Sequence, residues 1–115
     1  MKIVIELPII SGNKLLRMFW AKRAKIQRDY LLAILDETIG VKKGEQKKVK
    51  AVITSYRKRL LDTDNLYSGI KPLGDALKKA GLIWDDSPKW INLKARQIVD
   101  SKNPRTEIVI ENVEI

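Results

Sequence analysis

The spacing of hydrophobic residues along the chain changes several times between the two-residue repeat of a β-strand and the longer repeat of an α-helix. Residues 2–7 and 47–56 alternate in the first way, which predicts two strands. Two further strands are predicted at residues 90–99 and 106–113, and a long turn at residues 100–105 joins them as a hairpin. The chain therefore has enough strands for one sheet.

Helical spacing begins at about Leu15 and ends before Gly40, a residue type that commonly follows the last turn of a helix. The hydrophobic stripe of this segment consists of Ile26, Tyr30, Leu31, Ile34, Leu35 and Ile39. Its first half differs, because cations accompany Phe19 and Trp20: Lys14, Arg17, Lys22, Arg23, Lys25 and Arg28. Two interpretations stay open: a surface that contacts the DNA backbone, or a solvated helix face whose two rings belong to the core.

A second helical segment, from about residue 64 to residue 80, has two chemically distinct faces. The inward stripe consists of Leu66, Ile70, Leu73, Leu77 and Ala80. The opposite face carries Asp64, Ser68, Lys71 and Asp75. Pro72 interrupts this segment, because a proline ring clashes with the carbonyl group four residues earlier. The helix is therefore expected either to kink at Pro72 or to begin near Gly69 with Ser68 as its N-cap.

The order of elements, β-α-β-α-β-β, predicts a single α+β domain over residues 1–115, with a mixed four-stranded sheet and two covering helices. A composition of 44% hydrophobic and 32% charged residues is typical of a globular domain. The longest uncharged run, residues 7–13, is far shorter than the roughly 20 apolar residues of a membrane span. No signal segment opens the chain. We therefore expect a cytoplasmic protein with no membrane partner.

Two residue types are missing, and their absence excludes several kinds of chemistry. The chain has no cysteine, so disulfides, thiolate catalysis and zinc-thiolate sites are excluded. It has no histidine, the commonest transition-metal ligand and the usual general base. The 23 lysines and arginines exceed the 14 acids and give a net charge of +9. This charge favours a polyanion such as nucleic acid, and the alternative is a basic protein with no such partner.

Acidic residues are concentrated in one part of this basic chain. Five of the eight aspartates lie within residues 57–90, and four of them form two close pairs, Asp62 with Asp64 and Asp85 with Asp86. A basic triplet precedes them: Arg57, Lys58 and Arg59. Paired carboxylates repel unless cations or hydrogen bonds compensate them, and oxygen-only ligands suit Mg²⁺ or Mn²⁺. The alternative is that the first pair caps a helix and the second forms a turn.

The same region contains three short motifs in a fixed order. They are DTDNL at residues 62–66, KPLGDAL at residues 71–77 and GLIWDDS at residues 81–87. Through them the region resembles the RusA family of Holliday-junction resolvases, whose pattern is D-x-D-N, a helix with K-x-x-x-D-A-L, a glycine, and D-D. Weaker similarities lie nearer the N-terminus: Leu7, Pro8, Asn13 and Arg17.

The resemblance implies a RusA-like fold and Mg²⁺-dependent cleavage of four-way DNA junctions by a homodimer, with Mn²⁺ able to substitute and no small-molecule cofactor. At the positions that match the family's pattern, the resemblance implies that Asp62, Asp64 and Asp86 are the essential acids. It implies that Lys71 is the catalytic lysine. Asp85 is the neighbouring acid, and all four aspartates are expected metal ligands. The residues expected to contact DNA are Asn13, Arg17, Lys22, Arg23, Arg57, Lys58, Arg59 and Asn65.

The lysine departs from the family's pattern. In the best-known form of the family it follows the second aspartate by four residues, where this chain has Ser68, and Lys71 lies three residues further on. Three residues are nearly one helical turn, so Lys71 returns to the same face as Asp64 but about one turn further along.

The predicted helix also separates the two acid pairs, because its regular part alone spans roughly 16 Å. Asp86 therefore either returns when the chain doubles back after Gly81, or comes from the second subunit of a dimer, and we expect the second arrangement. A function of a different class is also open: a non-catalytic DNA-binding protein whose acids are structural.

Overall fold

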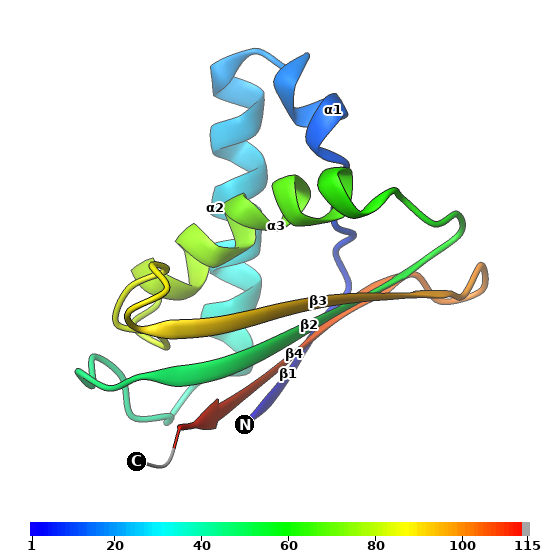
Figure 1. The fold of residues 1–115 in the computed structure, drawn as a ribbon. Helices are drawn as coiled ribbons and strands as arrows, with labels where there is room; N and C mark the ends of the chain where they lie inside the picture. Colours follow the sequence, from blue (N-terminus) through cyan, green and yellow to red (C-terminus); the bar gives the residue numbers. More distant parts are fainter. Residues whose placement is uncertain (114–115) are drawn as a thin grey trace.

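The computed structural model describes residues 1–113 and has a two-layer α+β fold (Figure 1). Its elements in chain order are β1 (Lys2–Ile5), α1 (Gly12–Leu16), α2 (Trp20–Glu37), β2 (Val49–Arg57), α3 (Thr63–Lys79), β3 (Ile91–Val99) and β4 (Arg105–Asn112). The predicted fold class and the mixed four-stranded sheet are confirmed, with three helices in place of two. No helix in the described part of the chain is long and apolar enough to cross a membrane.

The strands lie in the order β1-β4-β2-β3, so the predicted hairpin of the last two strands is wrong. β4 is antiparallel to both β1 and β2, whereas β3 is parallel to β2. The register places Ile53 of β2 between Ala95 of β3 and Ile108 of β4. Parallel neighbours need a long crossover, and α3 provides it between β2 and β3. This crossover brings the residues that follow α3 back to the edge of the sheet.

One face of the sheet and the inward stripe of α3 form the core. Val49, Ala51 and Ile53 of β2 are buried, which confirms the predicted alternation of this strand. All five predicted inward residues of α3 are buried as well: Leu66, Ile70, Leu73, Leu77 and Ala80. Each large apolar side chain contributes about 1.5–3 kcal/mol by leaving water. The polar side of α3 is consequently held in one orientation, away from the sheet.

Helix α3 follows the first of the two expected arrangements, one helix that passes through Pro72. It begins at Thr63 with Asp62 as its N-cap and continues through Pro72 to Lys79, so Ser68 is not the cap. Proline lacks an N–H, so the bond to the carbonyl of Ser68 is missing, yet packing on both sides keeps the helix in one piece. Gly69 allows a close approach on one side, because a Cβ there would collide with the carbonyl oxygen of Ile10.

The first helical segment consists of two helices, not one. Residues 17–19 separate α1 from α2, because Phe19 is extended, with φ −61° and ψ 149°. Ser11 caps α1 by accepting a hydrogen bond from the backbone N–H of Lys14 at 3.2 Å. The predicted stripe holds for Tyr30 and Ile34, which are buried, but fails at Ile39, which is 81% exposed beyond the end of α2.

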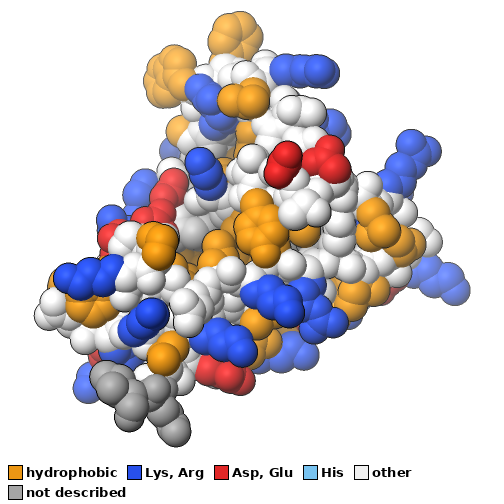
Figure 2. Space-filling model, in the orientation of Figure 1, with side chains coloured by type: hydrophobic (Ala, Val, Ile, Leu, Met, Phe, Trp, Pro, Cys, Tyr) orange, Lys and Arg blue, Asp and Glu red, His pale blue; other side chains and the backbone are white. Residues whose placement is uncertain are grey.

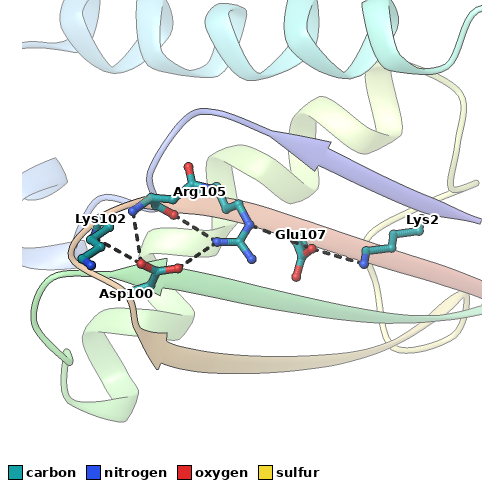
Figure 3. Close-up of polar contacts among 6 residues, drawn as sticks. Lys2, Asp100, Lys102, Arg105 and Glu107 are labelled. Carbon is teal, nitrogen blue, oxygen red and sulfur yellow. Dashed lines mark hydrogen bonds and ion pairs between the residues drawn. The ribbon is translucent and has the colours of Figure 1, made fainter.

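The other face of the sheet carries a row of ion pairs (Figure 3). Arg105 contacts Asp100 at 3.1 Å and Glu107 at 4.0 Å, and Lys2 contacts Glu107 at 3.2 Å. Arg105 and Glu107 alternate along β4 with the buried residues of the core, so they point away from the helices. The acids of this row already have cationic partners on the face opposite to α3.

Candidate functional site

The polar side of α3 borders an open groove of about 490 Å³. The groove is lined by Tyr67, Ser68, Ile70, Lys71, Gly74, Asp75, Asp86 and Leu93. Ser68, Lys71 and Asp75 stand on one helix face because they are three and four residues apart. Asp86 comes from the loop that follows α3, and Leu93 comes from β3. The βαβ crossover therefore assembles a surface from three separate segments.

Asp75 and Asp86 bring two carboxyl groups into contact in this groove. Burial and, after it, the neighbouring Asp86 carboxyl raise the pKa of Asp75, while Lys79 and Lys78 oppose this effect. Two adjacent carboxylates disfavour each other's charged form unless a proton or a cation lies between them. This pair is consequently suited to hold a proton or a cation between its carboxyl groups.

Asp85, the other acid of the second pair, points to a different partner. Its carboxylate accepts a hydrogen bond from Lys78 at 2.9 Å, and this lysine lies in the last turn of α3. The Lys78 ammonium, followed by the Ser87 side chain, lowers the pKa of Asp85 to about 2. The same contact raises the pKa of Lys78. Asp85 is thus committed to an ion pair at the surface of the helix end.

The first acid pair lies at the opposite end of α3. Asp62 accepts two hydrogen bonds from Asn65, one from its backbone N–H at 2.8 Å and one from its side-chain amide at 2.9 Å. The side-chain oxygen of Asn65 in turn accepts a hydrogen bond from the backbone N–H of Asn13 at 2.9 Å. These contacts form a brace that ties α1 to α3. Asp64, in the first turn of α3, is exposed.

The four aspartates predicted as metal ligands do not meet within one chain. Residues 1–113 contain no group of three acids placed to hold a metal ion. Asp75, the contact of Asp86, follows Asp64 by eleven residues, which is about 16 Å along a helix axis. Figure 2 shows acidic side chains in separate groups along the molecule. The oxygen donors suit Mg²⁺, but those of a single chain do not fit one centre, and Mg²⁺ binding stays a prediction.

Lys71 connects the groove to the basic part of α2. It also lines a neighbouring hollow of about 300 Å³, together with Arg23, Ala24, Gln27, Pro72 and Asp75. Arg23 is one of the predicted DNA contacts, and this hollow places it beside two residues of the groove. A cation predicted from the first helical segment and a lysine from the second thus border the same surface. Phosphate bound there would meet positive charge from both helices.

The basic triplet divides into two roles. Arg57 donates hydrogen bonds to the carbonyl of Ile9 at 2.9 Å, to the Ser55 hydroxyl at 3.2 Å and to the carbonyl of Arg59 at 2.7 Å. It therefore holds the loops around β2 together. Lys58 and Arg59 are exposed and border a separate hollow of about 410 Å³.

Asp75, Tyr67 and Leu93 line the groove but were not predicted as site residues. Asp75 was placed on the polar face of the helix, four residues after Lys71, and this spacing was the signal that could have identified it. The contact with Asp86 depends on how the loop after α3 folds back. No repeat within the sequence encodes such a contact, so it could not be predicted from spacing.

Comparison with protein-family models and with curated proteins gives no match for the chain. The resemblance to the RusA family therefore rests on the motifs of residues 62–87.

Proposed function

We propose that this chain is a structure-specific endodeoxyribonuclease that resolves four-way DNA junctions in the cytoplasm as a homodimer and needs Mg²⁺ or Mn²⁺. One observation carries the proposal: Asp86 folds back onto α3 and lines one groove with Asp75 and Lys71. Arg23 borders the same surface. The net charge of +9 and the motif order support a DNA substrate.

The residues of the groove suit a phosphodiester. Lys71 and Arg23 attract the phosphate oxygens and favour the negative charge that grows on them during cleavage. Asp86 is exposed, so its carboxylate can accept a proton from a water molecule that attacks the phosphorus. Tyr67 and Leu93 add apolar surface to the lining of the groove. The groove thus has a place for the phosphate and a base for the water.

A homodimer explains why the acids of one chain are apart. A four-way junction is cut by two incisions related by a two-fold axis, and a C₂ dimer has the same symmetry. Asp64 is exposed at the far end of α3, where it is accessible to a second subunit. In such a dimer Asp64 of one subunit and Asp86 of the other would hold the metal ion, which would activate the attacking water and offset the charge of the phosphate.

A second candidate function is a non-catalytic DNA-binding protein. Two specific observations favour it: Asp62 is used as a helix cap, and Asp85 is used in an ion pair with Lys78. Both are structural uses of acids that the nuclease proposal assigns to metal binding. The basic surfaces would be the same in either case, so binding to DNA alone does not separate the two functions.

Cleavage of labelled DNA separates them. Purified protein is incubated with a four-way junction, and with a linear duplex of the same sequence as control, in Mg²⁺ or in excess EDTA. The nuclease proposal expects paired incisions in the junction with Mg²⁺, few in the duplex, and none in EDTA. Binding of the junction without cleavage in Mg²⁺ or Mn²⁺ supports the second candidate, and equal cutting of the duplex contradicts structure specificity.

A further inference from the structure

The connection between α1 and α2 exposes three large hydrophobic side chains. We call residues 14–23 the elbow. Leu16, Phe19 and Trp20 are 76%, 87% and 75% exposed, so the interpretation that places the two rings in the core is wrong. The elbow lies at the end of α2 far from the sheet (Figure 1), and hydrophobic and basic side chains gather at this end in Figure 2. Large rings so far from the core need another explanation.

The charge around these rings has one sign. Residues 7–28 contain no acid and six cations. Lys25 is paired with Asp29 at 2.9 Å, whereas the other five cations of this segment are exposed: Lys14, Arg17, Lys22, Arg23 and Arg28. The N-terminus of α2 adds the positive end of a helix dipole. The rings therefore project from a surface that attracts anions.

The elbow also lacks the features that usually stabilise the start of a helix. Phe19 is the N-cap of α2 but makes no side-chain capping bond, and the first turn of α2 contains no acid. Lys22 and Arg23 stand there instead, where the helix dipole disfavours positive charge. A segment that lacks its local stabilising features and exposes its rings is expected at a binding site.

The positive charge of the elbow indicates which kind of molecule binds to this surface. A second copy of the chain would bring the same cations against each other, and like charges in an interface cost several kcal/mol. A nucleic acid offers phosphates for the cations and flat bases for the rings. The bases of an intact duplex are stacked on one another and expose only their edges, so the rings need bases that are unpaired.

We propose that Phe19 and Trp20 stack on unpaired bases at a DNA branch point while the neighbouring cations hold the phosphates. This inference rests on the proposed DNA substrate and extends it from backbone contacts to recognition of the branch itself. Arg23 belongs both to the elbow and to the hollow beside Lys71. Trp20 is three residues earlier, about 4.5 Å along the helix axis. A base on Trp20 would therefore lie close to the strand that enters the groove.

The test compares binding to three labelled DNAs in EDTA, where no metal-dependent cleavage occurs: a linear duplex, the same duplex with a central bubble of unpaired thymines, and a four-way junction. The elbow variant carries Phe19→Ala and Trp20→Ala. The matched control carries Leu32→Ala and Ile39→Ala, which remove exposed hydrophobic side chains beyond the elbow, 59% and 81% exposed in the native chain. Fluorescence anisotropy measures each affinity.

We expect the elbow variant to bind the bubble at least about 5-fold more weakly, since each stacked base contributes about 1–3 kcal/mol. Its affinity for the duplex should change little, and the control should bind all three DNAs normally. Lys22→Ala should instead weaken binding to every DNA alike and reduce the salt slope by about one. Equal losses on bubble and duplex in the elbow variant would overturn the stacking proposal.

A second readout reports on the ring directly. Trp84 and Trp90 are the other two tryptophans and pack edge to face at 6.2 Å, so phenylalanine at both positions keeps an aromatic pair and leaves Trp20 as the only tryptophan. We expect the bubble to quench its fluorescence and the duplex to leave it largely unchanged. Quenching by neither DNA contradicts the proposal.

Two further outcomes would assign the elbow to another occupant. Dissociation of a native dimer by the elbow variant, measured by sedimentation velocity, would make it a contact between subunits. Loss of binding to vesicles of anionic lipid, with DNA binding unchanged, would make it a membrane contact. The result is independent of the nuclease proposal: a protein that never cuts but loses bubble binding in the elbow variant supports this inference alone.

Discussion

The two ends of α3 carry acids that look alike in the sequence and differ in the structure. At the N-terminal end, Asp62 caps the helix and joins Asn65 in the brace to α1. Beside the C-terminal half, Asp86 lies against Asp75 in the groove. The first arrangement satisfies a carboxylate with N–H donors, whereas the second leaves two carboxyl groups facing each other. Stability explains the position of Asp62 at the first end, whereas the contact of Asp75 with Asp86 at the second end requires a functional reason.

The largest expected effect is on cleavage. In the nuclease proposal Asp86→Asn removes both a metal ligand and the proton acceptor of the groove, so we expect the rate of junction cleavage to fall by at least about 10²–10⁴-fold. Asp64→Asn should also abolish cleavage, because it removes a metal ligand. Single-turnover assays in Mg²⁺ measure these rates, and anisotropy in EDTA should show junction binding intact.

Asp36→Asn provides the matched control, because Asp36 is an exposed acid on α2 that lines neither the groove nor the hollow beside Lys71. It should cleave at the native rate. Native activity in Asp86→Asn would contradict the role that the nuclease proposal gives to Asp86.

The second prediction asks whether the two ends act together across subunits. Asp64→Asn and Asp86→Asn subunits, each inactive alone, are mixed and allowed to exchange. With shared sites, one site of a mixed dimer carries both substitutions and the other carries neither, so nicking of one strand should return. Absence of nicking in verified mixed dimers would show that each subunit builds its own site.

Local sequence patterns predicted the elements that position the two ends of α3. The inward stripe of α3 and the alternation of β2 are confirmed because burial repeats with the geometry of the element itself. A helix cap at the first acid pair was also among the alternatives weighed for Asp62, since a cap depends on residues three apart.

Non-local contacts are where prediction from the sequence failed. The predicted β3–β4 hairpin is wrong because β2 inserts between the two strands, and strand spacing contains no information about sheet order. The division of the first helix was missed because residues 17–19 contain neither glycine nor proline. Of the two arrangements expected for α3, one helix through Pro72 is observed and a start near Gly69 is not, because tertiary packing outweighs the effect of Pro72. Contacts between segments, such as Asp75 with Asp86, fall into the same class.

The third prediction tests the structural role of the N-terminal end. Asp62→Ala removes the cap of α3 and its bonds to Asn65, so we expect the free energy of unfolding to fall by about 0.5–2 kcal/mol. Asp64→Ala should cost less, because Asp64 contributes through the helix dipole alone. Urea unfolding followed by circular dichroism measures both. An equal loss in the two variants would contradict the distinction between a capping acid and an exposed one.

The smallest expected effect concerns pH, and it separates the two acids near the end of α3 by sign. Contact with Lys78 lowers the pKa of Asp85 from 3.8 to about 2 in the folded chain. Its contribution to stability is therefore present above pH 3.8 and is lost as the pH falls towards about 2. Burial and Asp86 raise the pKa of Asp75 above 3.8, so charging Asp75 destabilises the folded state as the pH rises past that value.

The two asparagine variants should consequently respond in opposite directions. At pH 7, Asp85→Asn should unfold at a lower urea concentration than the native chain, because it loses an ion pair. Asp75→Asn should unfold at a higher one, because it loses a partly buried charge that lies beside another carboxyl group. Below the ordinary pKa of 3.8 the advantage of Asp75→Asn should vanish, since the native carboxyl is then protonated in both states. An advantage that persists at pH 3 would mean that the asparagine acts by packing rather than by removing charge.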